Sequence, residues 1–562
     1  MEEETPMRKI LALVLCVAML FSVPAMAEEL TGQADGFMGL VTVTVVKEGD
    51  DIVSVEVEAA SDTPAMVTMA VDGVVPQIVE KDSTEVDVVA NATFTSNGII
   101  NAVNNALDPE QFPYVAETEE EVEAAPIVAE AAEAYIGLGV HSMGRKGPGS
   151  DNTETGVYSF NEVVAAVIFD AEGKILLAKV DQLEIATPNY DGSTMPHLSG
   201  FPGQSYNNDA DHDAVVDGVI EVTPESFLAE VDTWQTKRER GEGYVMGTGV
   251  WAQQMDKFEE VFVGKTVEEV EQWFAAYCSD RNGRPLKAGS SNEEDAAKYD
   301  ALTDDEKAML ADVTSAATMS LNDGHGNILA AVKKAYENRV ALEIESASAI
   351  GLGVHNMGRK GPGSDNTETG VYSFNNVYAA VLFDADGKIV ASYADQLEVA
   401  TPNYDGSTMP HLSGFPGQSY NNDADHDAVV DGVIEVTADS FLAEVESWQT
   451  KRERGEGYVM GTGVWAQQMD KFQEVFVGKT VEEVEQWFAA YCSDRNGRPL
   501  KAGSSNEEDA AKYDALTDDE KTMLADVTTA ATMSLNDGHG NILGAYEKAW
   551  ENRVDIELTV GK

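Results

Sequence analysis

Cysteine and basic residues are scarce in this sequence. Its 562 residues include only three cysteines, which excludes a disulfide-stabilised scaffold and any cysteine-rich zinc or iron–sulfur site. Lys and Arg total 37 against 99 Asp and Glu, so the formal net charge is −62. Such a surface repels phosphate backbones, and we expect no nucleic-acid partner. No Cys-x-x-Cys or His-x-x-x-His spacing predicts a metal site.

Long apolar runs are also absent, apart from one near the start of the chain. Met7-Arg8-Lys9 precedes an apolar run over Ile10–Val23, and Ala25-Met26-Ala27 follows it. A basic start, a short apolar stretch and an Ala-x-Ala ending predict a secretory signal peptide over residues 1–27. The run is too short to span a bilayer as an anchor. We therefore expect an extracytosolic protein, secreted or at the cell surface.

The chain repeats itself at a constant offset of 214 residues. Gly137 corresponds to Gly351 and Cys278 to Cys492, and Thr187–Thr223 is identical to Thr401–Thr437. Ahead of the two copies lie a smaller unit and a stretch rich in Ala and Glu, a composition that suits a solvated linker. The expected organisation is a signal peptide (1–27), a small domain (28–115), an acidic linker (116–134), copy 1 (135–346) and copy 2 (347–562).

The patterning predicts an α+β fold. Alternating residues predict a strand over Gly39–Val46 and a second over Ile52–Val57, joined by a turn. In copy 1, Val163–Phe169 and Ile175–Val180 form a second predicted hairpin. We expect a small antiparallel sheet with helices in each of the three domains. The rest of each copy is predicted to be a large insertion, mostly helices and loops.

One constellation of polar residues occurs three times. In each case an Asp stands six residues before a Thr, an Ala precedes that Thr, and an apolar helix is predicted to follow. A further hydroxyl residue lies three positions before the Thr in the two copies only. The residues concerned are Asp87 and Thr93 in the small domain, Asp312, Ser315 and Thr318 in copy 1, and Asp526, Thr529 and Thr532 in copy 2.

This constellation resembles the signature of the FMN-binding domain family, Asp-x-x-Ser/Thr-Gly-Ala-Thr followed by a helix. The family occurs in the flavin-carrying subunits of sodium-pumping NADH:quinone oxidoreductase and related redox complexes. The resemblance implies that Thr93, Thr318 and Thr532 each carry FMN through a phosphoester bond made by a dedicated flavin transferase. A hydroxyl at the start of a helix suits this role, because the helix N-terminus favours a phosphate. The same residues also suit ordinary helix N-caps.

The function implied by this resemblance is a secreted electron carrier with up to three covalent FMN groups. It would take electrons from a membrane redox donor and pass them to an extracellular acceptor. No catalytic residue is identifiable, so a carrier is favoured over an enzyme. Two alternatives stay open: a non-redox repeat protein for binding or adhesion, and an extracellular flavin-dependent reductase with its site in the insertion.

Several further motifs in the copies allow more than one interpretation. The basic run Lys237, Arg238 and Arg240 suits either a helix C-terminus or contact with a flavin phosphate or ring. Gly144–Gly149 is a locally basic loop, and His325 follows Thr318 by seven residues. Other features favour structural roles. Thr266 and Glu269 predict a capping box, Cys278 a small buried hydrophobe, and Asp209, Asp211 and Asp213 only partly match a calcium loop.

Overall fold

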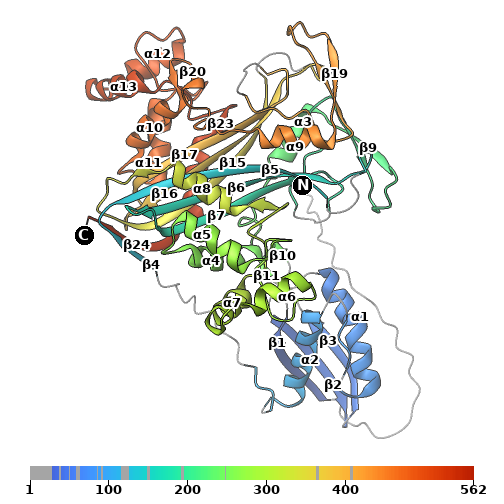
Figure 1. Cartoon of the computed structure of the whole chain (residues 1–562). Coiled ribbons are helices and arrows are strands. Elements are labelled where there is room, and N and C mark those ends of the chain that lie inside the picture. The colour runs from blue at the N-terminus through green and yellow to red at the C-terminus, as the bar shows by residue number, and fades with distance from the viewer. Residues whose placement is uncertain are drawn as a thin grey trace, which may run out of the picture. The chain divides into compact units, whose positions relative to one another are not determined.

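The protein divides into two compact units, Met1–Ala124 (unit 1) and Ala125–Lys562 (unit 2) (Figure 1). The expected signal peptide, residues 1–27, lies outside the part of the chain that the structure describes. None of the described helices is long and apolar enough to cross a membrane. This computed structural model describes residues 28–36, 40–49, 51–58, 64–84, 86–89, 93–109, 111–114, 126–147, 152–190, 195–246, 249–361, 366–404 and 409–561.

Unit 1 is a three-stranded antiparallel sheet with two helices. The sheet order is β1-β2-β3, and the elements are β1 (Glu28–Asp35), β2 (Leu40–Glu48), β3 (Asp51–Glu58), α1 (Pro64–Lys81) and α2 (Thr93–Leu107). Val41, Val43 and Val45 are fully buried and alternate with half-buried residues, which is why this segment forms a one-sided strand. The predicted hairpin is therefore confirmed.

Helix α2 packs closely on strand β1. Its buried residues Ile99, Ala102, Val103 and Ala106 face the sheet. A Cβ on Gly32 of β1 would lie 2.1 Å from the backbone oxygen of Ala102. Only glycine permits this approach of strand and helix, so Gly32 fixes how α2 lies on the sheet.

The two copies in unit 2 each contribute three long antiparallel strands. The predicted hairpin of copy 1 is confirmed, but its strands are longer than expected, because nearly every residue is buried and the alternating pattern is lost. The sheet orders are β14-β5-β6-β7 and β17-β16-β15-β24-β4. The strands are β5 (Ala134–Lys146), β6 (Tyr158–Asp170), β7 (Ile175–Ala186), β14 (Val340–Ala341), β15 (Ser346–Lys360), β16 (Tyr372–Phe383) and β17 (Ile389–Ala400).

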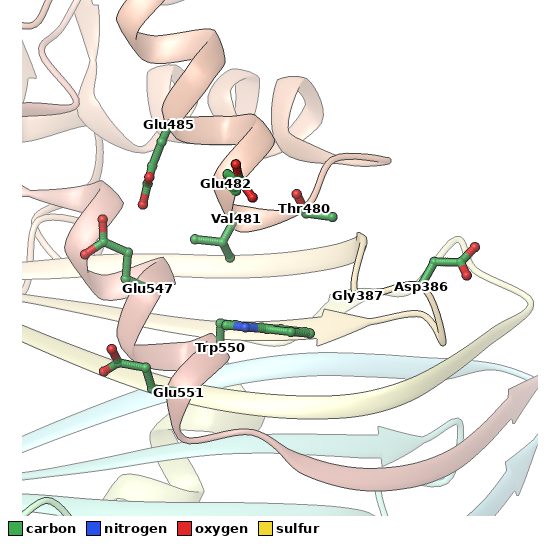
Figure 2. A pocket seen from close by; sticks show the side chains of 9 residues that line it. All are labelled: Asp386, Gly387, Thr480, Val481, Glu482, Glu485, Glu547, Trp550 and Glu551. Atoms are coloured by element: carbon green, nitrogen blue, oxygen red, sulfur yellow. The ribbon is translucent and has the colours of Figure 1, made fainter.

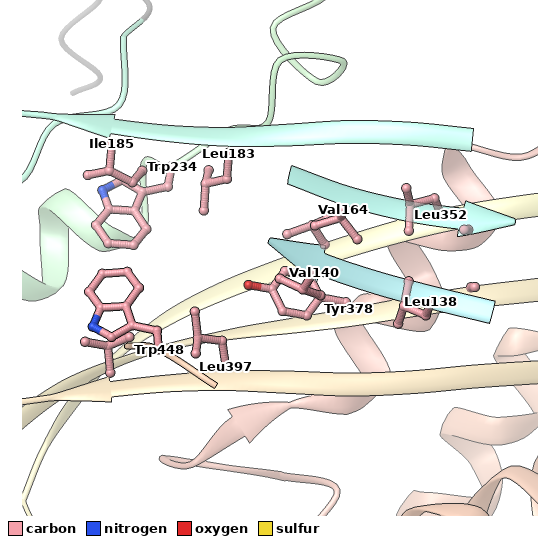
Figure 3. Packing of buried hydrophobic residues seen from close by; sticks show 14 of the residues in the cluster. Leu138, Val140, Val164, Leu183, Ile185, Trp234, Leu352, Tyr378, Leu397 and Trp448 are labelled. Atoms are coloured by element: carbon pink, nitrogen blue, oxygen red, sulfur yellow. The ribbon is translucent and has the colours of Figure 1, made fainter. Parts of the chain in front are cut away.

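The two sheets pack face to face around one shared core. Phe160 of copy 1 stacks on Phe374 of copy 2, with ring centroids 5.4 Å apart and planes at 4°. Trp234 and Trp448 point toward one another beside them, one from each copy (Figure 3). The copies are therefore one folded unit in which each sheet needs the other to bury its inner face.

Strand β4 (Ile127–Ala131) forms in a segment for which the sequence predicts a solvated linker. It lies inside the interval 116–134, which was expected to be a solvated linker. It pairs in parallel with β24 (Val554–Val560) at the far end of the chain. A partner more than 400 residues away leaves no local signal, and the Ala- and Glu-rich composition conceals a strand with one buried residue, Ala129.

Helices cover the outer face of each sheet (Figure 1). Copy 1 contributes α4 (Trp251–Phe262), α5 (Val267–Tyr277), α7 (Asp304–Ala316) and α8 (Ile328–Glu337), and copy 2 contributes α10 (Trp465–Phe476), α11 (Val481–Tyr491), α13 (Asp518–Ala530) and α14 (Ile542–Glu551). The predicted capping box is confirmed, with Thr266 and Glu269 bonded reciprocally at the start of α5.

Short elements complete the insertions, as predicted for mostly helical and loop segments. The helices are α3 (Pro224–Val231), α6 (Glu293–Asp300), α9 (Ala438–Glu446) and α12 (Glu507–Asp514), with the single turns η1 (Gly241–Gly243) and η2 (Gly455–Gly457). The hairpins pair β8 (Ser205–Asn208) with β9 (Gly218–Glu221), β10 (Val245–Met246) with β11 (Gly249–Val250), β12 (Asn322–Asp323) with β13 (Gly326–Asn327), β18 (Ser419–Asn422) with β19 (Gly432–Glu435), β20 (Val459–Met460) with β21 (Gly463–Val464), and β22 (Asn536–Asp537) with β23 (Gly540–Asn541).

Candidate functional site

The segment that leads to Thr93 is tied to both helices of unit 1. The backbone N–H of exposed Asp87 donates to Gln77 Oε1 of α1 (3.3 Å), and Gln77 Nε2 donates to the Asp87 oxygen (3.1 Å). The backbone N–H of Val89 donates to Ser96 Oγ of α2 (3.2 Å). A Cβ on Gly73 would lie 2.3 Å from Val89 Cγ2, so glycine lets the segment lie directly on α1. These contacts hold residues 86–89 against both helices.

Thr93 is the first residue of α2, as expected for a hydroxyl at a loop-to-helix junction. The first N–H groups of a helix have no partner within it, and the helix dipole makes this end attractive to a phosphate. The first turn of α2 carries no acidic residue, whereas that of α7 carries Asp304, Asp305 and Glu306. The start of α2 therefore accepts an anion without a competing carboxylate on its own first turn.

The equivalent threonines of unit 2 do not begin a helix, which corrects the sequence interpretation. In copy 1, Asp312 and Ser315 lie inside α7, and Thr318 follows the end of that helix. The next helix, α8, begins ten residues later at Ile328. In copy 2, α13 likewise contains Asp526 and Thr529, and Thr532 follows its end. The backbone at these positions presents the carbonyl end of a helix, which disfavours a phosphate.

A buried glutamine holds the loop at each of these threonines. The backbone N–H groups of Thr318 and Met319 donate to Gln254 Oε1, at 2.9 and 3.0 Å. Gln468 receives the same pair from Thr532 and Met533, each at 2.9 Å. The leading acids form ion pairs instead of touching the threonines. Lys257 lies 2.9 Å from Asp312, and Lys471 lies 2.8 Å from Asp526.

Beside each of these loops lies a group of cationic and aromatic side chains, here called the basic–aromatic cluster. It brings together residues of two motifs that are separate in the sequence. One is Arg145 of the segment expected to be a basic loop, but Arg145 lies in strand β5, so that expectation is wrong at this residue. The other is the run Lys237–Arg240. Its members are Arg145, Glu184, Tyr190, Lys237, Arg240, Tyr244 and Trp251 in copy 1, and Arg359, Glu398, Tyr404, Lys451, Arg454, Tyr458 and Trp465 in copy 2.

The centre of the cluster is a buried carboxylate with cations around it. Glu184 Oε1 lies 3.4 Å from Arg145 Nη1, and Glu184 Oε2 lies 3.2 Å from Lys237 Nζ. Lys237 and Glu184 are each at most 1% exposed. The Arg240 guanidinium stacks on the ring of Tyr244, 3.8 Å from its centroid. Burial lowers the pKa of Arg240, only partly offset by the charges of Tyr244 and Glu184.

Backbone hydrogen bonds explain why the basic run lies here. The N–H of Lys237 donates to the oxygen of Gln182 in β7 (2.8 Å), and Arg238 Nε donates to the oxygen of Val180 (2.7 Å). The run therefore follows the edge of β7. Helix α3 ends earlier, at Val231, so the interpretation of these residues as helix C-terminal charges is wrong. Arg238 itself pairs with Glu259 at 2.7 Å, outside the cluster.

A histidine–aspartate pair borders the cluster. His325 Nδ1 lies 3.0 Å from Asp323 Oδ1, and Gln182 Nε2 donates to the His325 oxygen. Burial acts to raise the pKa of Asp323, but hydrogen bonds from His325 and the positive charges of His325 and Lys237 outweigh it and lower this pKa. Sequence reasoning placed His325 near Thr318 but gave no signal for Glu184 or Tyr244, whose partners are distant along the chain.

Other candidate residues have simpler roles. Cys278 is 1% exposed, and burial raises the pKa of its thiol to about 12, so the interpretation as a buried hydrophobe fits and a nucleophilic role does not. The acidic loop brings together Asp209, Asp211 and Asp217, instead of Asp213 as its third member. The Asp209 carboxylate accepts backbone hydrogen bonds from Asp213 and Ala214, which organise the loop.

An acid-lined pocket of about 520 Å³ is a feature of copy 2 (Figure 2). The hydrogen bond that the protonated Glu547 carboxyl donates to Glu485, together with burial, raises the pKa of Glu547 to about 7. Copy 1 has Lys333 at the position of Glu547, and Lys333 lies 3.8 Å from Glu271. The pocket is lined by Asp386, Gly387, Thr480, Val481, Glu482, Glu485, Glu547, Trp550 and Glu551.

Comparison with known proteins supports a flavin in unit 1. Residues 36–108 match the FMN-binding domain family, a span that contains Asp87 and Thr93. The chain is also 37% identical, over 193 residues, to a chlorophenol reductase of Desulfitobacterium hafniense. That match covers 33% of this chain and spans about half, 53%, of the relative. Because 193 residues exceed the 124 of unit 1, the match includes part of unit 2.

Proposed function

We propose that this protein is an extracytosolic electron-transfer protein that carries FMN on Thr93 through a phosphoester bond. The observation that carries the proposal is the position of Thr93 at the start of α2, inside a segment that matches the FMN-binding domain. The bond joins the threonine hydroxyl oxygen to the FMN phosphorus. A flavin transferase would make it from a flavin dinucleotide: the pyrophosphate bond of the donor breaks, a nucleoside monophosphate leaves, and the hydroxyl proton is lost to solvent. FMN supplies the electron chemistry there, and a tethered cofactor does not diffuse away outside the cell.

The residues of unit 1 have separate parts in this function. Thr93 would hold the phosphate, and the first N–H groups of α2 would neutralise part of its charge. Gln77 and Ser96 fix the approaching segment through its backbone, and Gly73 lets that segment lie against α1. Electrons would arrive from a membrane redox donor and leave to an extracellular acceptor.

FMN on Thr318 and Thr532 as well would make the protein a relay of three flavins. Both threonines are half-buried beside a basic–aromatic cluster, since Gln254 lies one helical turn from Trp251 on α4. Their position after a helix end, however, offers the phosphate no N-terminal N–H groups. We therefore propose Thr93 as the main site of FMN attachment and place Thr318 and Thr532 second.

A flavin-dependent reductase is the second candidate function. The relative is named for the reduction of a chlorophenol, and its similarity extends into unit 2. In this version unit 1 carries the flavin and unit 2 contributes the site for the molecule that is reduced.

Replacement of Thr93 by Ala is expected to remove one covalent flavin per chain, because alanine has no hydroxyl oxygen to form the phosphoester bond. The full chain is co-expressed with a flavin transferase, and in-gel flavin fluorescence is measured under denaturing conditions. Thr95→Ala is the matched control, because Thr95 lies in the same helix but is 2% exposed. Thr93→Ala protein as fluorescent as wild type would refute the assignment. Thr318→Ala and Thr532→Ala test the relay in the same way.

A further inference from the structure

The basic–aromatic cluster holds more positive than negative charge in a very acidic chain. Its three cations, Arg145, Lys237 and Arg240, meet one carboxylate within the cluster, Glu184. Asp323 at its border is close enough for Lys237 to lower its pKa. In the part of the chain that the structure describes, three cations therefore share two carboxylates, although acids outnumber bases by 99 to 37 in the whole sequence. A cluster with one cation in excess is complementary to a monoanion.

Buried polar atoms in the cluster have few hydrogen-bond partners. Among the described residues, Lys237 Nζ and Glu184 Oε2 form their ion pair but make no other hydrogen bond, Asn161 Nδ2 makes none, and Lys451 Nζ and Glu398 Oε2 repeat the ion pair in copy 2. Both lysines are 1% exposed. A buried ammonium has three donors, so one carboxylate partner leaves it able to donate to a further oxygen. Asn161 adds a further amide donor on the neighbouring strand, so the same place offers donors for an oxygen ligand.

The walls of the cluster are aromatic. Lys237 Nζ lies 5.3 Å from the ring centroid of Tyr244 and 5.6 Å from that of Trp251. Arg145 lies 5.7 Å from the ring centroid of Tyr190. Tyr190, Tyr244, Arg145 and Arg240 are half-buried and border solvent, whereas Lys237 and Trp251 lie beneath the surface. Planar guanidinium and ring faces suit a planar ligand.

We propose that each basic–aromatic cluster binds one small aromatic anion, a phenolate or an aryl carboxylate, so that each chain binds two. The anionic oxygen pairs with Arg145, Lys237 and Arg240 or with their copy 2 equivalents, and the ring lies among the tyrosine and tryptophan side chains. The same residue types at both positions, 214 residues apart, make the two sites equivalent. The inference concerns unit 2 alone and does not depend on a flavin at Thr93.

Equilibrium dialysis of the full chain with 4-nitrophenolate tests this site, at a pH where the phenol is ionised. Protein made without a flavin transferase is used, so failure of the flavin proposal cannot affect the result. Two equivalent sites per chain are expected. Nitrobenzene tests the need for charge and cyclohexanecarboxylate the need for a ring, and both are expected to bind at least about tenfold more weakly.

The double variant Arg240→Gln, Arg454→Gln is expected to weaken 4-nitrophenolate binding by about 10- to 100-fold, the value of a charge-assisted hydrogen bond. Arg339→Gln, Arg553→Gln is the matched control. Those arginines also stack on an aromatic ring, at 3.7 Å in each copy, but lie outside the cluster. Circular dichroism verifies that both variants fold. The proposal is overturned if wild-type protein does not bind 4-nitrophenolate, or if the cluster variant binds it as tightly as the control variant does. It is also overturned if nitrobenzene binds as tightly as 4-nitrophenolate.

Protein produced with the transferase separates a free ligand from a tethered one. If FMN were esterified to Thr318 and Thr532 and blocked 4-nitrophenolate, the clusters would serve the flavin, and the proposal of a free aromatic anion would be wrong. Equal binding by protein made with and without the transferase supports it.

Discussion

Replacement of Phe374 by Ala is expected to destabilise both copies of unit 2, by about 3–5 kcal/mol. Phe374 is fully buried in the core that the two sheets share. It stacks on Phe160 of copy 1, and its centroid lies 5.2 Å from that of Trp234 of copy 1 and 6.0 Å from that of Trp448. The cavity would therefore remove contacts from the sheet of copy 1 as well as from that of copy 2.

Hydrogen exchange of the backbone amides measures this effect copy by copy. Protection of β6 in copy 1 and of β16 in copy 2 is expected to fall together, by about two to three orders of magnitude. Phe472→Ala is the matched control, because Phe472 is equally buried but packs only within copy 2. It is expected to affect α10 and its neighbours more than β6. Unchanged protection of β6 in the Phe374→Ala variant would show that the copies are independent domains.

The stability of unit 2 is expected to fall between about pH 4.5 and 7, largely because of Glu162. This carboxyl lies fully buried between the copies, and burial raises its pKa from 4.5 to about 7 despite hydrogen bonds from Tyr378 and Asn376. The folded state holds the proton more tightly than the unfolded state. The contribution of Glu162 to the free energy of unfolding is therefore complete below pH 4.5. It is lost as the pH rises to 7, and the free energy of unfolding falls by about 3 kcal/mol.

The variant Glu162→Gln keeps the shape of the side chain and removes its charge, so it is expected to flatten this part of the pH profile. Denaturant unfolding at a series of pH values gives the comparison. Some dependence should remain, because burial also raises the pKa values of Asp181 and Asp395 to about 6. The exposed Glu474→Gln serves as control. A profile that Glu162→Gln leaves as steep as that of wild type would contradict the assignment.

Local features of the fold could be predicted from the sequence. The hairpin of β2 and β3 and the capping box of Thr266 depend on residues close together in the chain, and both are confirmed. The shared core and the pairing of β4 with β24 depend on residues hundreds of positions apart. Hydrophobic periodicity carries no information about such pairings. The sequence therefore predicts one folded domain for each repeat, whereas the two repeats share one core.

The candidate sites also differ in whether their residues are close together or far apart in the chain. Thr93 could be placed at the start of a helix because the motif and the helix adjoin each other. In copy 1 the same spacing falls in the last turns of α7, which contains Asp312 and Ser315 and ends at Ala316, just before Thr318. The basic–aromatic cluster could not be predicted as a unit. Its members come from β5, β7, the segment after β7, the segment after α3 and the start of α4, and only the fold brings them together.

The most direct test of the central claim is peptide mass mapping of the mature protein, produced where its flavin transferase is active. The account predicts that the peptide containing Thr93 carries one FMN in phosphoester linkage, and that fragmentation places the added mass on Thr93 rather than on Thr95. An unmodified Thr93 peptide in that material would contradict the account.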